Sequence, residues 1–120
     1  MARLVARDGA TRIAVIGAGS WGTTVAAHLA TAAPTVLWSR RPDVADDVAA
    51  GRGNRRYLDG HALPSELDAT SDLAAAVDGA SILVVAVPTH GFRDVLAEAA
   101  PGVADGVPVV SLAKGFEQGT

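Results

Sequence analysis

The glycine-rich segment after the first apolar run constrains the fold of this chain more than any other feature. Residues 12–17 (RIAVIG) form a continuous apolar, β-branched run, which predicts a buried strand. The segment GAGSWG then places Gly17, Gly19 and Gly22 in the G-x-G-x-x-G spacing. The first glycine permits a tight turn, the second lets a diphosphate approach the backbone, and the third lets the next helix pack close to the strand. The pattern therefore predicts a strand, a tight turn and a helix in direct succession.

The start of that helix is a candidate anion site. Its first backbone N–H groups, near Ser20 and Trp21, have no partner within the helix, and the helix dipole favours negative charge there. A glycine-rich turn alone is a weak signal, because such turns also occur without a ligand. Here the turn follows a strand, opens a helix and lies in the first strand–helix–strand unit. This context favours a dinucleotide site.

The rest of the chain alternates short apolar runs with alanine-rich stretches. We expect strands at 12–17, 35–40, 67–70, 81–88 and 107–113, and helices at 21–32, 42–50, 73–77 and 91–99. Strands that alternate with helices predict a parallel sheet with right-handed crossovers. The expected fold is a doubly wound α/β sheet of the Rossmann type, with strand order 3-2-1-4-5. A polar segment at 51–66 is longer than an ordinary connection, which favours a functional or disordered loop.

Size and composition agree with one small domain. The 120 residues are 49% hydrophobic, carry a formal net charge of −3 and include no cysteine. Such a weak charge favours neither a nucleic-acid nor a membrane partner, and disulfides and thiolate metal sites are excluded. No apolar run approaches the roughly 20 residues that span a bilayer, and no signal peptide is recognisable, so we expect a cytoplasmic protein. The chain stops just after a strand, which favours a truncated N-terminal domain of something longer.

The end of the second expected strand bears on which dinucleotide is bound. NAD sites usually carry an acidic residue here, about 20 residues past the glycines, to bond the ribose 2′-hydroxyl. This chain has Ser39, Arg40 and Arg41 instead, and arginine can grip a 2′-phosphate with two donors. We expect NADP(H) to be tolerated or preferred. NAD(H) stays open because arginine also stacks on adenine, and both arginines could instead be solvated beside Asp43 and Asp46.

Five segments, in this order, resemble the N-terminal domain of bacterial NAD(P)-dependent glycerol-3-phosphate dehydrogenases: GAGSWGTTVAAHLA, LWSRRP, NRRYLDGHALP, VVAVPTH and AKGFEQGT. The resemblance covers residues 12–120, the expected dinucleotide-binding domain, and residues 1–11 form an extension without a counterpart. Its most specific parts are Ser-Trp in the glycine turn, Arg-Tyr-Leu in the long loop and the terminal Ala-Lys-Gly. That family reduces dihydroxyacetone phosphate to sn-glycerol 3-phosphate with NADPH or NADH, to supply phospholipid synthesis. The resemblance therefore implies an oxidoreductase.

The resemblance also implies roles for individual residues. Ser20 and Trp21 would contact the cofactor beside its diphosphate, next to the three glycines. Arg40 and Arg41 would hold the adenosine end. Tyr57, in the long loop, would lie near the cofactor.

Lys114 is the only lysine of the chain and stands just past the end of the last expected strand. In doubly wound sheets ligands bind beyond the carboxyl ends of the strands. The resemblance implies that Lys114 reaches both the nicotinamide end of the cofactor and the phosphorylated substrate. The family's proton-donating lysine and most of its contacts to the substrate phosphate lie in a helical C-terminal domain that this chain lacks. We therefore expect the chain to bind cofactor with little or no turnover. A homodimer that forms through the missing domain is an open alternative.

Other polar residues receive structural interpretations. His28 is expected in packing or at the surface. His61 is expected in a solvated loop, with an approach to the cofactor as the alternative. His90 stands at a strand end and is a candidate for lining the cleft. No two histidines have metal-pair spacing, so no metal is expected. Trp38 is expected in the core. A solvated helix face is expected for Asp43, Asp46 and Asp47.

Two other classes of function share these features. One is a non-catalytic module that senses NAD(P) with the same Rossmann turn. The other is a related reductase, of the ketopantoate or 2-ketoacid type. Ser20-Trp21 and the Ala-Lys-Gly segment argue against the second class, through the resemblance alone.

Overall fold

The computed structural model of the protein describes residues 11–54, 63–87 and 89–112. In chain order the elements are β1 (Ile13–Ile16), α1 (Ser20–Ala30), β2 (Thr35–Trp38), α2 (Pro42–Ala49), β3 (Leu67–Thr70), α3 (Leu73–Val77), β4 (Ile82–Val85), α4 (Thr89–Ala99), the 3-10 turn η2 (Ala100–Gly102) and β5 (Val109–Ser111). All nine expected strands and helices are present in the described residues. Most strands are shorter than expected, because the ladder ends where the chain leaves the sheet.

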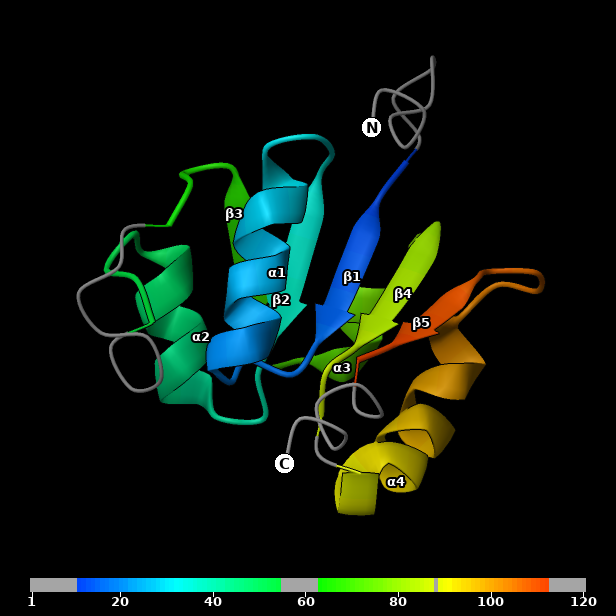
Figure 1. Ribbon diagram of the computed structural model, residues 1–120. Helices are drawn as coiled ribbons and strands as arrows, with labels where there is room; N and C mark the ends of the chain where they lie inside the picture. The colour runs from blue at the N-terminus through cyan, green and yellow to red at the C-terminus, as the bar shows by residue number, and fades with distance from the viewer. Residues whose placement is uncertain (1–10, 55–62, 88, 113–120) are drawn as a thin grey trace.

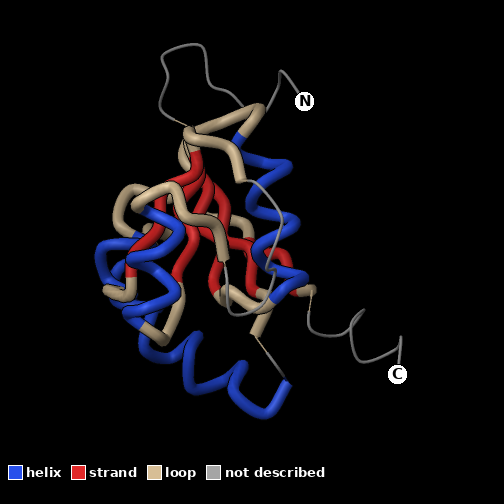
Figure 2. Tube along the Cα trace, turned by 90° about the vertical axis from the view of Figure 1, so that its left-hand side faces the viewer, coloured by secondary structure: helices blue, strands red, loops and turns tan. Residues whose placement is uncertain are grey.

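The five strands form one parallel sheet in the order β3-β2-β1-β4-β5, as predicted. Each helix connects two parallel strands and lies on a face of the sheet. Figure 1 shows α1 in front of the strands and α3 behind them, and Figure 2 shows helices along both sides of the sheet. The fold is therefore the doubly wound α/β sheet that the alternating pattern predicts.

Two hydrophobic clusters fill the space between the sheet and its helices. Alternate residues of β1 enter different clusters, since successive side chains of a strand point to opposite faces. Ile13 and Val15 pack with α1 and α2, whereas Ala14 and Ile16 pack with α3 and α4. All four are at most 1% exposed. Burial of each large aliphatic side chain stabilises the fold by roughly 1.5–3 kcal/mol.

Helix α1 packs against the sheet through small residues. The spacing of Trp21, Val25 and Leu29 indicated a helix, but its fully buried positions are Gly22, Thr23, Ala26 and Ala30. Val25 and Leu29 are only partly buried at the edge of a cluster, and Trp21 is 48% exposed. The helix also begins one residue before the expected start and ends two residues before the expected end. Small side chains on the buried face bring the helix close to β1.

The short helix α3 begins at a side-chain cap. Asp72 is the N-cap, and its carboxylate accepts a hydrogen bond of 3.3 Å from the Ala75 amide. This selects Asp72 over Ser71, the two residues that the pattern allowed. In the described part of the chain, no helix is long and apolar enough to cross a membrane.

Candidate functional site

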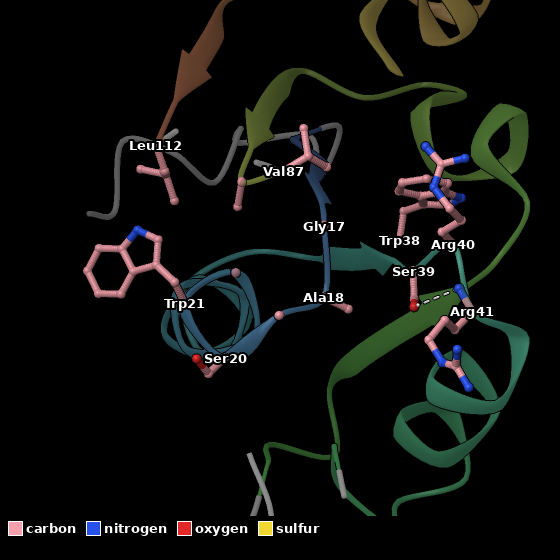
Figure 3. A pocket seen from close by; sticks show the side chains of 13 residues that line it. Gly17, Ala18, Ser20, Trp21, Trp38, Ser39, Arg40, Arg41, Val87 and Leu112 are labelled. Carbon is pink, nitrogen blue, oxygen red and sulfur yellow. Dashed lines mark hydrogen bonds between the residues drawn. The ribbon is translucent and has the colours of Figure 1, made fainter. Parts of the chain in front are cut away.

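A cavity of about 290 Å³ lies at the carboxyl edge of the sheet. Every residue that lines it belongs to the glycine turn or lies at or just past the end of a strand. They are Gly17, Ala18, Gly19, Ser20, Trp21, Gly22, Trp38, Ser39, Arg40, Arg41, Ala86, Val87 and Leu112. Figure 3 shows Trp21 and Leu112 at one end of this cavity, Trp38 and the two arginines at the other, and the glycine turn between them. The cavity is therefore elongated, with a different chemistry at each end.

The register of the sheet brings these segments together. Ile16, the last residue of β1, pairs with Trp38 of β2 and Val85 of β4, and Val85 pairs with Ser111 of β5. Four strands therefore end at the same level. Between β1 and β4 the strand order reverses, and the helices that follow these two strands leave toward opposite faces. Ligands of doubly wound sheets bind in the crevice that this reversal opens.

Steric contacts within the protein require glycine at two of the three positions. Gly17 has φ +118°, which L side chains rarely adopt, and a Cβ there would lie 3.0 Å from the carbonyl carbon of Ala86. A Cβ on Gly22 would overlap the carbonyl oxygen of Gly17. These contacts agree with the predicted tight turn and the predicted close packing of helix on strand.

Gly19 differs from both, since nothing in the described structure lies within 4 Å of a Cβ built on it. Its backbone angles, φ −69° and ψ −177°, suit any residue. No contact among the described residues therefore explains a glycine here. The open space in front of its backbone is the cradle that a diphosphate needs, and the residues present fit a dinucleotide.

The N-terminus of α1 supplies the electrostatics of the cavity. Gly19 is its N-cap and provides no side-chain cap, and the first turn contains no acidic residue. Helix hydrogen bonding starts with the Thr23 amide, which donates to the Gly19 carbonyl at 2.9 Å. The N–H groups of Ser20 and Trp21 come before this first helical hydrogen bond, so they have no acceptor within the helix. They and the helix dipole favour an anion at the centre of the cavity.

The two arginines are held differently at the far end. The guanidinium carbon of Arg40 lies 5.5 Å from the centroid of the Trp38 ring, within range of a cation–π interaction. Arg41 pairs with Asp43 at 3.3 Å, and its amide donates to the Ser39 hydroxyl at 3.1 Å. Both partners of the ion pair are well exposed, so the pair contributes at most about 1 kcal/mol. Arg41 is therefore exposed beside Asp43 and also lines the cavity.

Asn54 is a buried polar residue that sequence reasoning missed. It is 1% exposed, and its amide nitrogen donates to the Ala18 carbonyl at 2.8 Å and to the Thr23 hydroxyl at 2.7 Å. Both partners belong to the glycine turn or the first turn of α1. Nothing in the sequence around Asn54, a polar glycine- and arginine-rich stretch, distinguishes it from a solvated loop residue.

Most of the predicted site residues come together in the cavity. The glycines, Ser20, Trp21, Arg40 and Arg41 all line it. Tyr57, His61 and Lys114 lie outside the described residues, and so does the side chain of His90. Trp38 is 4% exposed, which confirms the core prediction, but it also lines the cavity. Sequence reasoning did not single out three other lining residues, which follow the ends of strands: Ala86, Val87 and Leu112.

The remaining polar candidates lie apart from the cavity. His28 is exposed on α1, as expected. Asp43 and Asp46 are exposed, and the half-buried Asp47 pairs with Arg52 at 2.8 Å. The described ranges contain no group of three or more histidine, aspartate or glutamate side chains that could hold a metal ion.

Comparison with known proteins agrees with this geometry. Residues 12–120 match the family described as NAD-dependent glycerol-3-phosphate dehydrogenase N-terminus. The chain is 48% identical to the NAD(P)+ glycerol-3-phosphate dehydrogenase 2 of Sphingopyxis alaskensis over 88% of its own length and 32% of the relative's. It is 47% identical to the corresponding enzyme of Mycobacterium avium over 91% of its length and 32% of the relative's.

A solved structure gives the same result. The crystal structure of glycerol-3-phosphate dehydrogenase from Coxiella burnetii superposes with a TM-score of 0.77 at 33% identity, over 88% of this chain and 34% of that one. The chain thus spans about a third of the length of the relatives it matches. Because the family match covers nearly all of it, the chain belongs to the NAD-dependent glycerol-3-phosphate dehydrogenase N-terminus family.

Proposed function

We propose that this chain is the cofactor-binding domain of an oxidoreductase that interconverts dihydroxyacetone phosphate and sn-glycerol 3-phosphate with NAD(P)H. The observation that carries the proposal is the open space over Gly19, at the N-terminus of α1, in an elongated cavity with arginines at one end. Family membership supports the same reaction. The nicotinamide cofactor supplies the hydride of such a reaction, and the protein supplies binding and orientation.

The two ends of the cavity suggest how the dinucleotide lies. The diphosphate would sit at the centre, on the N–H groups of Ser20 and Trp21. Arg40 and Arg41 would hold the adenosine end, where their charge also suits a 2′-phosphate. The nicotinamide end would extend toward Val87 and Leu112, whose apolar side chains help exclude water from a reacting centre.

Two further residues enter the proposal through their place in the chain. Lys114 follows Leu112, which lines the cavity at the end of β5, so the lysine would reach the nicotinamide end and the phosphorylated substrate. Tyr57 would lie near the cofactor. Because the chain spans about a third of its relatives, we propose that most substrate contacts lie elsewhere and that the chain alone turns over little. A cytoplasmic location, a role in phospholipid synthesis and a homodimer stay predictions.

Addition of NADPH or NADH is expected to quench tryptophan fluorescence saturably. Trp21 is 48% exposed and lines the cavity, so a bound dinucleotide would change its surroundings. Trp38 is buried and donates to the Ser71 carbonyl at 3.1 Å, so it should respond less. A titration of the wild type beside Trp21→Phe separates the two signals. Unchanged emission at millimolar cofactor would count against the proposed function.

Arg40→Gln is expected to weaken NADPH by roughly tenfold and NADH by about twofold or less, since a charge-assisted contact to the 2′-phosphate contributes about 1.5 kcal/mol. The control is Arg52→Gln, which removes the same charge from a side chain that pairs with Asp47 and does not line the cavity. Both dissociation constants are measured by the fluorescence titration. Equal losses for the two cofactors would remove the 2′-phosphate argument.

A further inference from the structure

We propose that Asn54 is a positioning residue for the cofactor site, because its side-chain amide orients the peptide between Ala18 and Gly19. This inference rests on the proposed function, since it concerns the same cavity. It adds a residue outside the cavity lining to the machinery that holds the diphosphate. It also assigns a role to the buried side-chain amide of Asn54, which links the glycine turn to the end of the segment that follows α2.

Three hydrogen bonds form a connected set among Asn54, Thr23 and the Ala18 carbonyl. The Asn54 amide nitrogen donates to the Ala18 carbonyl at 2.8 Å and to the Thr23 hydroxyl at 2.7 Å. The Thr23 hydroxyl in turn donates to the same carbonyl at 3.3 Å. Ala18 is 6% exposed, Asn54 1% and Thr23 0%. Because these groups are buried from solvent, breaking any one of these hydrogen bonds costs free energy.

The consequence for the cavity follows from peptide geometry. The peptide between Ala18 and Gly19 is trans, so its carbonyl and its N–H point in opposite directions. Two donors hold the Ala18 carbonyl inside the protein, so the Gly19 N–H is directed away from Asn54. Gly19 lines the cavity with open space before it. A flipped peptide would instead present a carbonyl oxygen to the diphosphate and repel it.

Asn54 is well placed for such a role because it is distant in sequence. It lies 36 residues after Ala18 and 31 after Thr23, beyond α1, β2 and α2. Gly53, the residue before it, has φ +78°, which fixes how the chain turns into this contact. The simpler interpretation is that the contact only stabilises the packing of α1. A positioning role predicts that loss of the contact lowers cofactor affinity, whereas a packing role predicts a loss of stability alone.

The test compares Asn54→Ala with a matched pair of isosteric variants. Thr23→Val removes the hydroxyl that belongs to the set, and Thr35→Val removes a buried hydroxyl that donates to the Ala33 carbonyl at 2.9 Å, at the other end of β2. We expect Asn54→Ala to weaken NADPH and NADH by the same factor, about tenfold, and Thr23→Val to weaken both by a smaller factor. Thr35→Val should reduce stability and leave both dissociation constants unchanged.

The outcomes separate the two interpretations. If Asn54→Ala folds and binds both cofactors as the wild type does, the inference is wrong and the proposed function stands. If the wild type itself binds neither cofactor, both are overturned. Should Asn54→Ala not fold, Thr23→Val decides: affinity equal to that of Thr35→Val contradicts the inference, and a loss confined to Thr23→Val supports it.

A spectroscopic measurement reads the contact directly. Asn54 is the only asparagine in the chain, so selective isotope labelling of asparagine gives one side-chain amide signal pair. We expect both protons of this amide to exchange slowly with solvent, and their shifts to move when NADPH binds. If NADPH binds the chain and the chemical shifts of this amide do not change at saturation, the inference is wrong.

Discussion

Gly22→Ala is expected to destabilise the fold by about 3 kcal/mol. A Cβ at this position would overlap the Gly17 carbonyl oxygen and would lie 3.1 Å from the Gly17 carbonyl carbon and 3.2 Å from the Ala86 Cβ. Two of these atoms are backbone, so no side-chain rotation relieves the overlap. Helix α1 would have to move away from β1, against the dense packing of Gly22, Thr23, Ala26 and Ala30 on the sheet.

The expected effect is opposite in sign to the usual effect of replacing a helical glycine by alanine. Inside a helix, alanine is normally more favourable than glycine by about 1 kcal/mol. Gly91, in α4, provides the matched control, since nothing in the described part of the chain lies within 4 Å of a Cβ built there. Gly91→Ala should therefore stabilise the chain slightly, while Gly22→Ala unfolds it at a much lower denaturant concentration. If chemical denaturation gave the two variants the same midpoint, the close packing of α1 on the glycine turn would be wrong.

Gly19→Ala is expected to reduce affinity for both cofactors roughly 100-fold, with a change in stability below about 1 kcal/mol. The backbone of Gly19 suits alanine, and apart from its chain neighbours no atom of the described residues lies within 4 Å of the added Cβ. The methyl group would therefore occupy the space that we assign to the diphosphate. Since both cofactors carry the same diphosphate, NADPH and NADH should lose the same factor.

Calorimetric titration and denaturation of this variant give the two quantities separately. Gly22→Ala and Gly19→Ala then form a pair: the first should lose stability, and the second should lose affinity alone. Undiminished binding by Gly19→Ala would show that the diphosphate lies elsewhere. A large loss of stability would instead show that Gly19 is also constrained by the protein.

Much of the fold could be predicted because two local signals agree along the chain. Apolar runs marked four of the five strands, whereas β3 (LDAT) has a mixed sequence. The alternation with helices indicated the parallel sheet and its strand order. The three glycines could be assigned in advance because their spacing reflects three distinct steric needs. The structure supports this division, since a Cβ on Gly17 or Gly22 would meet other described residues and a Cβ on Gly19 would not.

Other features depend on contacts that a sequence does not display. The buried face of α1 is made of glycine, threonine and alanine, which do not form an apolar stripe that periodicity would detect. Asn54 meets Ala18 only because the fold returns the chain there after 36 residues. The cavity end formed by Trp21 and Leu112 depends on the register of β4 and β5, which single strand patterns do not define.

The most direct test is a crystal structure of the chain with NADPH bound. The diphosphate is expected over Gly19, within hydrogen-bond reach of the Ser20 and Trp21 amides, with the adenosine 2′-phosphate beside Arg40. A cofactor whose diphosphate lay at another edge of the sheet, or an empty cavity at saturating NADPH, would contradict the account.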